Sequence, residues 1–212
     1  MTKPEKERKL KIHLFKSREP QCFYSVPNII TVLRLSCSLV FFVLAITQMN
    51  PTYNFIGFGI HWLGDFIDGF YARKFKQETI LGAEIDIIAD RVEILFFYVN
   101  FLYFRPYLFL PVVLYLIDYT FIDFYLSYQF IKYDIISPNY FYKVDKVVYL
   151  LNYSPGGKFC NSSIVTLLLI FLPQIQIVAT IIAAILIGVK LFSIYLLNKK
   201  RLKTKRGDYL SL

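Results

Sequence analysis

The sequence predicts an all-α integral membrane protein with six transmembrane helices, on the basis of its composition and its long apolar runs. Of its 212 residues, 56% are hydrophobic and only 18% are charged, whereas a soluble domain usually carries about a quarter charged residues. Apolar runs of about 20 residues can cross a bilayer as helices. Such runs lie at 29–47, 54–72, 84–104, 108–131, 159–173 and 174–197.

Prolines mark the boundaries between several of these runs. Pro27 opens the first run, Pro51 lies between the first and the second, and Pro173 separates the last two. Proline lacks a backbone N–H and is poorly tolerated inside a helix, so these positions agree with helix boundaries. The fifth run, at 159–173, is the shortest and its start is the least well defined.

Basic residues alternate with the runs in the way expected of a helical membrane protein, because cytoplasmic loops carry an excess of Lys and Arg. They concentrate in both tails and in the loops 73–82 and 132–158, whereas the opposite connections carry only Arg105. We therefore expect both termini to be cytoplasmic. The predicted parts are a basic cytoplasmic or interfacial segment, a six-helix transmembrane domain and a basic cytoplasmic tail, at 1–27, 28–198 and 199–212.

Four aspartates lie in the stretch GDFIDGFYARKFKQETILGAEIDIIADR, near the cytoplasmic ends of the second and third predicted helices. They are Asp65, Asp68, Asp86 and Asp90. Residues three, four or seven apart share a helix face, so each helix presents two carboxylates and at least one small residue on one stripe. The small residues are Gly69, Ala72 and Gly82.

Carboxylates inside a bilayer are costly and require a partner or a function. Four facing carboxylates would repel one another unless cations lay between them, and oxygen ligands favour Mg²⁺, Mn²⁺ or Ca²⁺. Two divalent ions a few ångströms apart are a recurring device for phosphoryl transfer. The simpler alternative is that the aspartates pair with Arg73, Arg91 and neighbouring lysines.

These positions follow the pattern D-x-x-D-G-x-x-A-R, eight residues, then G-x-x-x-D-x-x-x-D. The sequence therefore resembles the CDP-alcohol phosphatidyltransferases, and its phosphatidylglycerophosphate synthase-like members in particular. All eight signature positions match, and the six-helix layout is that of the family. The matching residues are Asp65, Asp68, Gly69, Ala72, Arg73, Gly82, Asp86 and Asp90.

The resemblance implies a site with two Mg²⁺ or Mn²⁺ ions that grip the diphosphate of CDP-diacylglycerol. Asp65, Asp68 and Asp86 would hold the ions, with Asp90 also near them. Asp90 would take the proton from an incoming hydroxyl, which attacks the lipid-side phosphorus and expels CMP. Space for the cytidine nucleotide would come from the three small residues, and Arg73 would steady a phosphate or a carboxylate. The family also implies a homodimer.

Other polar residues in the apolar runs carry weaker signals. In the first run, Asn28, Thr31 and Arg34 lie on adjacent helical turns and are candidates for lining the nucleotide pocket, although helix capping and interfacial anchoring explain them equally well. For His61 we expect a structural role. Asp118 and Asp123 are five residues apart, which places them on different faces of an α-helix, so we expect hydrogen bonds between helices rather than one shared site.

The expected acceptor is a small phosphorylated alcohol, because the cytoplasmic loops carry a surplus of basic residues, among them Lys143 and Lys146 as speculative contacts. Glycerol 3-phosphate comes first and inositol phosphate second. Ile87 and Arg91 follow the third and fourth aspartates, where glycerol-3-phosphate members often show proline and lysine. An arginine after the fourth aspartate is found in inositol-type, inositol-phosphate-type and some cardiolipin-forming members, which keeps those acceptors open. Alternatives of other classes are a membrane prenyltransferase and a cation transporter.

The expected location is the bacterial inner membrane, with the active site facing the cytoplasm. Membrane lipid is then a partner, and no nucleic-acid partner is expected.

Overall fold

The computed structural model describes residues 23–209, and every element in that range is helical. This confirms the all-α class for the described residues. The predicted basic segments at 1–27 and 199–212 lie partly outside them. The described chain forms two compact units, one of residues 23–107 with Phe130–Ser137 and the other of residues 108–129 with 138–209.

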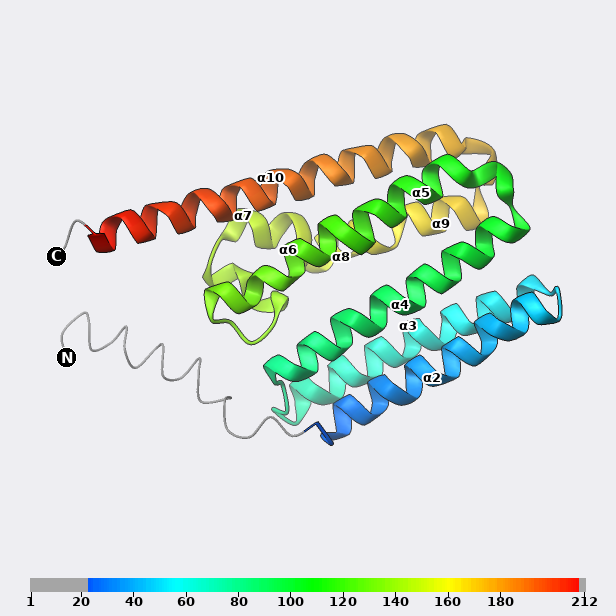
Figure 1. The fold of residues 1–212 in the computed structure, drawn as a ribbon, viewed down its shortest axis with the longest axis horizontal. Coiled ribbons are helices and arrows are strands. Elements are labelled where there is room, and N and C mark those ends of the chain that lie inside the picture. The colour runs from blue at the N-terminus through cyan, green and yellow to red at the C-terminus, as the bar shows by residue number, and fades with distance from the viewer. Residues whose placement is uncertain (1–22, 210–212) are drawn as a thin grey trace. The chain divides into compact units, whose positions relative to one another are not determined.

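The first unit is built on three long helices that lie side by side and alternate in direction (Figure 1). They are α2 (Val26–Thr47), α3 (Pro51–Lys74) and α4 (Ile80–Phe104), and each contacts both others. The connections are only a few residues long, which forces consecutive helices to run antiparallel. The predicted runs at 29–47, 54–72 and 84–104 therefore fall inside observed helices.

Each of these helices begins at a polar residue that caps its first turn. Ser25, Asn50 and Thr79 accept hydrogen bonds from the backbone N–H groups two or three residues later, which satisfies donors that the helix leaves open. At the end of α3, Lys76 adopts a left-handed backbone conformation with φ 54°. The backbone N–H of Gln77 then donates to the carbonyl of Ala72, so the chain reverses sharply between the two aspartate pairs.

Aromatic rings and two asparagines hold the far half of the three helices together. The rings of Phe58 and Phe97 stack with centroids 4.2 Å apart. The side chain of Asn100 donates to the carbonyl of Phe42 at 2.8 Å and to the side chain of Asn54 at 3.1 Å. Buried polar groups are costly unless they are hydrogen-bonded, and here each amide joins two helices.

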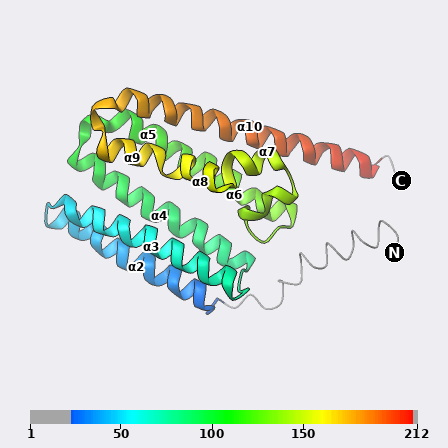
Figure 2. The same ribbon diagram turned by 180° about the vertical axis from the view of Figure 1, so that it is seen from behind.

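The second unit consists of shorter helical pieces packed against one long helix, α10 (Gln176–Tyr209), which contacts α5 (Phe109–Ile117) and α9 (Ile164–Phe171) (Figure 2). The other elements of this unit follow α5 or precede α10. They are η3 (Asp118–Asp123), α6 (Phe124–Tyr128), η5 (Pro138–Lys143), α7 (Lys146–Val148), η6 (Tyr149–Tyr153), α8 (Pro155–Ser162) and η7 (Pro173–Ile175). Two further 3₁₀ turns, η2 (Pro106–Leu108) and η4 (Gln129–Tyr133), lie where the chain passes between the units.

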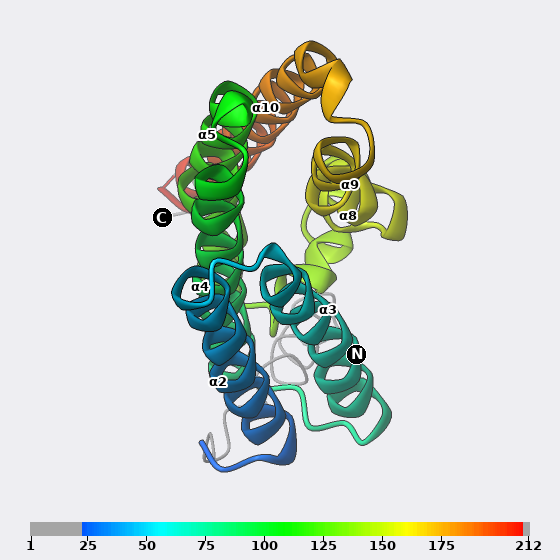
Figure 3. The ribbon, with the colours of Figure 1, turned by 90° about the vertical axis from the view of Figure 1, so that its right-hand side faces the viewer.

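The predicted run at 159–173 is divided between α8 and α9, which follow one another along nearly the same line (Figure 3). The break falls at Ser163, whose φ is −112°. The neighbouring Ser162 hydroxyl donates to the carbonyl of Lys158. Serine side chains that bond the backbone in this way compete with regular helical hydrogen bonding.

Three helical stretches in the described chain are long and apolar enough to cross a membrane: Val26–Thr47, Pro106–Tyr133 and Pro173–Arg201. Large apolar side chains also point outward along these stretches, as Leu33 and Ile177 do. A soluble monomer rarely exposes so much contiguous apolar surface. These features indicate a membrane protein, whereas the six spans and the cytoplasmic termini stay predictions.

The prediction that Asp118 and Asp123 lie on different faces is wrong. They begin and end η3, which is a π-helical turn rather than an α-helical one. Since a π-helix closes hydrogen bonds between residues five apart, the two carboxylates come to the same side. Both bind Lys190 of α10, at 2.6 Å and 3.1 Å from its Nζ. The expected link between helices is present, as an ion-pair cluster.

Lys190→Met is expected to lower the thermal stability of the protein strongly. Asp118 and Lys190 are fully buried, and removal of one partner from a buried ion pair typically costs about 3–5 kcal/mol. The measurement is the thermal unfolding midpoint in detergent. Lys199→Met on the exposed side of the same helix is the matched control, and equal midpoints for the two variants would show that the cluster contributes nothing.

Candidate active site

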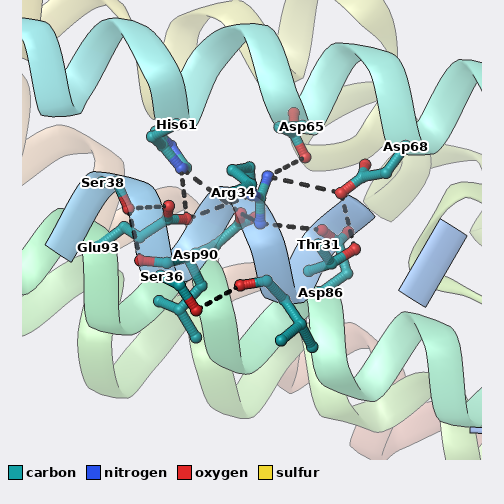
Figure 4. Close-up of polar contacts among 12 residues, drawn as sticks. Thr31, Arg34, Ser36, Ser38, His61, Asp65, Asp68, Asp86, Asp90 and Glu93 are labelled. Atoms are coloured by element: carbon teal, nitrogen blue, oxygen red, sulfur yellow. Dashed lines mark hydrogen bonds and ion pairs between the residues drawn. The ribbon is translucent and has the colours of Figure 1, made fainter. Parts of the chain in front are cut away.

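The centre of the candidate site is Arg34, which α2 places between α3 and α4 (Figure 4). Its side chain is only 1% exposed, and its guanidinium faces five carboxylates from the two neighbouring helices. The distances are 3.4 Å from Nη1 to Asp65, 3.9 Å from Nη1 to Asp68, 3.4 Å from Nη2 to Asp86, 3.0 Å from Nη2 to Asp90 and 3.4 Å from Nε to Glu93.

On α3, the two signature aspartates differ in their surroundings. The Asp65 side chain is 51% exposed, whereas that of Asp68 is buried. The hydroxyl of Thr31 donates to Asp68 Oδ2 at 2.7 Å, so α2 supplies both a cation and a hydrogen-bond donor to this pair. The Thr31 hydroxyl thus orients a carboxylate of the site, and its lining of the nucleotide pocket stays a prediction.

On α4, three carboxylates follow one face of the helix: Asp86, Asp90 and Glu93. The structure places Glu93 deepest, with a fully buried side chain. The hydroxyl of Ser38 donates to one of its oxygens, and His61 Nδ1 lies 2.9 Å from the other. The prediction of a structural role for His61 agrees with this contact.

Sequence reasoning missed Glu93 as a member of the site. The signal was available, because positions 86, 90 and 93 continue the four- and three-residue spacing of one helix face. The family signature ends at Asp90 and does not include Glu93. The sequence places Arg34 on a helical turn next to Thr31, but it does not predict that the guanidinium of Arg34 lies at the centre of the site.

Gly64 is the residue that makes room for Arg34. A Cβ atom built on Gly64 would lie 2.3 Å from Cδ, 2.4 Å from Cγ and 2.9 Å from Cβ of Arg34. Real Cβ atoms do not approach other atoms so closely, and two of these contacts are with the inner part of the side chain rather than with its flexible end. The α2–α3 packing at the site therefore depends on a glycine at this position.

Two of the predicted small residues, Gly69 and Gly82, lie beside polar side chains. The guanidinium of Arg73 lies over Gly69, 3.1 Å from where a Cβ would stand, and the side chain of Arg73 is exposed. A Cβ on Gly82 would stand 2.9 Å from Oδ1 of Asn28. Asn28 therefore lies beside Gly82, and Ala72 is half-buried. The nucleotide-binding roles of these residues stay predictions. In the ion pairs of the described residues, Arg34 is the cation that contacts all four signature aspartates.

The carboxylates are close enough to share a cation. One oxygen each from Asp65, Asp68 and Asp86 lie within 4.8 Å of one another, and His61, Asp90 and Glu93 form a second group of the same compactness. The first group offers oxygen atoms alone, a donor set that suits Mg²⁺ or Mn²⁺ rather than zinc or copper. Its partly exposed aspartates leave an approach for a ligand from outside.

The fold and this site define a helical membrane protein with an acidic centre suited to divalent cations and phosphate groups. The model of the CDP-alcohol phosphatidyltransferase family matches residues 24–189. The chain belongs to the CDP-alcohol phosphatidyltransferase family.

Several curated proteins are similar to parts of the chain. A CDP-diacylglycerol–glycerol-3-phosphate 3-phosphatidyltransferase of Cereibacter sphaeroides is 34% identical over 106 residues, which cover 47% of this chain and 48% of that protein. The enzyme of the same name from Aquifex aeolicus is 30% identical, over 44% of this chain and 52% of its own.

A CDP-diacylglycerol–inositol 3-phosphatidyltransferase of Candida albicans is 36% identical over 69 residues, or 32% of this chain and 29% of that protein. The chain thus spans about half or less of the length of these relatives. No solved structure is significantly similar to it.

Gly64→Ala is expected to destabilise the protein by about 1–3 kcal/mol, the usual cost of overpacking a well-packed interior, because the methyl group collides with Arg34. Gly59→Ala on the same helix is the control, since a Cβ there meets no atom within 4 Å. The comparison is made on thermal unfolding midpoints, and a Gly64→Ala midpoint at or above that of Gly59→Ala would contradict the close packing.

Proposed function

We propose that the protein transfers a phosphatidyl group from CDP-diacylglycerol to a small polar alcohol and releases CMP. The observation that carries the proposal is the convergence of four signature aspartates, from two helices, on one partly exposed site. Membership of the CDP-alcohol phosphatidyltransferase family supports the same reaction class. A membrane prenyltransferase would normally carry its aspartate motifs on helices far apart in sequence, whereas here they lie on one hairpin.

Two divalent ions, bound by Asp65, Asp68 and Asp86 with Asp90 nearby, would neutralise the charge of the leaving diphosphate. Asp90 is the proposed general base. Its side chain is 19% exposed, and its Oδ1 lies 3.0 Å from Arg34 Nη2. The acceptor hydroxyl transfers its proton to Asp90 while its oxygen bonds to the phosphorus that carries diacylglycerol. The bond from that phosphorus to the CMP oxygen breaks, and CMP leaves.

The proposed acceptor is glycerol 3-phosphate. Relatives from Cereibacter sphaeroides, Aquifex aeolicus, Haemophilus influenzae and Pseudomonas fluorescens carry this acceptor in their names. The basic residues of the 73–82 and 132–158 loops also favour an acceptor with its own phosphate, because charge-assisted hydrogen bonds to phosphate are strong.

Inositol is the second candidate acceptor, although the names of the relatives do not favour it over glycerol 3-phosphate. The relative from Candida albicans, named for inositol, is 36% identical over its matching stretch. Arg91 directly follows the fourth aspartate, as in inositol-type members. Inositol phosphate and phosphatidylglycerol, the cardiolipin-forming acceptor, belong in the same comparison.

The remaining parts of the proposal concern the setting of the enzyme. We infer a multi-pass protein of a bacterial inner membrane with six spans and cytoplasmic termini, in which the aspartates face the cytoplasm and two copies form a homodimer. The alternation of basic loops supports the orientation, and the family resemblance supports the dimer.

Asp90→Asn is expected to reduce CMP release by at least about 100-fold, the lower end of what a positioned general base contributes, while CDP-diacylglycerol still binds. The amide keeps the shape of the side chain and loses its basicity. Glu84→Gln on the same helix serves as the control. Turnover of Asp90→Asn near that of the control would remove Asp90 from the role of base.

Metal removal should abolish CMP release, and Mg²⁺ or Mn²⁺ should restore it, because the ligand set consists of carboxylate oxygens. The measurement is activity after treatment with a chelator and dialysis, with each ion added back separately. Restoration by Zn²⁺ alone would contradict the assignment of the site.

The acceptor is identified by offering purified protein CDP-diacylglycerol with glycerol 3-phosphate, inositol, inositol phosphate, serine, choline and phosphatidylglycerol in parallel. The expected result is the highest kcat/KM for glycerol 3-phosphate. Preference for free inositol would replace the first acceptor by the second. No release of CMP with any acceptor would overturn the proposed reaction itself.

A further inference from the structure

Glu93 is a fifth carboxylate at the site, and the proposed reaction gives it no task. It is fully buried and accepts contacts from Ser38, His61 and Arg34 Nε. Three contacts from two other helices fix the Glu93 carboxylate in place. A buried acid is costly unless its charge is compensated, so its presence requires a reason.

Arg34 divides its nitrogens between Glu93 and the aspartates. Nε faces Glu93, while Nη1 faces the α3 aspartates and Nη2 faces the α4 aspartates. The Nη groups therefore contact the same carboxylates that would ligate divalent ions. A guanidinium and a metal ion cannot both be closest to those oxygens, so the two cations compete for them.

The charges of the site are consistent with such competition. The five carboxylates and the one guanidinium together carry four negative charges, which two divalent ions would balance. Without Glu93, the same two ions and Arg34 would leave a surplus positive charge in an apolar surrounding. Glu93 thus matches Arg34, and the four aspartates match the ions.

The stem of Arg34 cannot move far. Its Cβ, Cγ and Cδ atoms pack directly on Gly64, and its side chain is 1% exposed. When divalent ions bind the aspartates, the guanidinium can therefore rotate and withdraw locally, but it cannot leave the helix interface. Glu93 Oε2, 3.4 Å from Nε, is the partner that it retains.

We propose that Arg34 is an exchangeable counter-cation of the aspartate site, and that Glu93 is a positioning residue that retains Arg34 when divalent ions take the aspartates. His61 and Ser38 hold Glu93 in the orientation that this requires. The inference rests on the proposed function only in taking the divalent ions as those of the transfer reaction.

The test measures the affinity of the purified full-length protein for Mn²⁺ in detergent, without any substrate. Bound and free Mn²⁺ are distinguished by electron paramagnetic resonance. Arg34→Met is expected to bind Mn²⁺ about tenfold more tightly, because the competing cation is gone, which corresponds to about 1.4 kcal/mol. Glu93→Gln is expected to bind Mn²⁺ about tenfold more weakly, since Arg34 then keeps only the aspartates as partners.

The double variant Arg34→Met/Glu93→Gln separates this coupling from a general loss of charge. Glu93→Gln should have much less effect in the Arg34→Met background, because a double-mutant cycle isolates the interaction between the two residues. Glu84→Gln removes a carboxylate from the same helix without a described contact to Arg34 and is expected to leave Mn²⁺ affinity unchanged.

A second readout is thermal unfolding, measured with and without Mn²⁺. In the presence of a chelator, Arg34→Met should unfold at a lower temperature than the wild type, and saturating Mn²⁺ should raise its midpoint more than it raises that of the wild type, because a ligand that binds the folded state tightly stabilises it. The Glu93→Gln result is independent of whether Arg34→Met folds.

Weaker Mn²⁺ binding by Arg34→Met would overturn the proposal, because Arg34 would then assist the ions. Equal affinities for Glu93→Gln and Glu84→Gln would overturn the role of Glu93. Absence of Mn²⁺ binding by the wild type would overturn both this proposal and the metal site. Absence of CMP release together with the expected shifts in Mn²⁺ affinity would overturn the proposed reaction alone.

Discussion

The ion contacts of Arg34 are the interaction on which the first unit depends. One side chain from α2 reaches carboxylates on both α3 and α4, so it determines which helices are neighbours at the site. Isolated charges of either sign would be expelled from an apolar interior, whereas one guanidinium can face several carboxylates because its donors are fixed in a plane. The sequence of α3 is adapted to this contact as well, because a Cβ atom at position 64 would collide with the side chain of Arg34.

Much of this unit could be predicted from the sequence, because its determinants are local. Apolar length, proline and capping residues define the helices within a few residues, and the spacing of Asp65, Asp68, Asp86 and Asp90 places them on facing stripes. The structure brings the four together as expected. Their chemical roles follow from the family resemblance and stay predictions, because geometry alone does not distinguish a metal ligand from a base.

The rest could not be predicted, because it depends on contacts between distant segments or on irregular backbone. The guanidinium of Arg34 reaches the centre of the site only because α2 packs on both other helices, which no pattern within α2 reveals. The assumption of regular α-helix gave the wrong relation between Asp118 and Asp123. A break at Ser163 divided a run that its apolar composition alone predicted to be continuous.

The π-helical turn η3 carries one residue more than an α-helical path between the same points would need. Removal of a single residue between Asp118 and Asp123 would restore an ordinary α-helical turn and leave the direction of α6 nearly unchanged, because the wider π-helical turn already absorbs the additional residue. The two aspartates would then be four residues apart, which still places them on one face of the helix beside Lys190. In this part of the chain, one additional residue is therefore accommodated by the π-helical turn. An alignment with a relative that has a regular α-helix here needs a one-residue gap between Asp118 and Asp123, which the apolar pattern does not reveal.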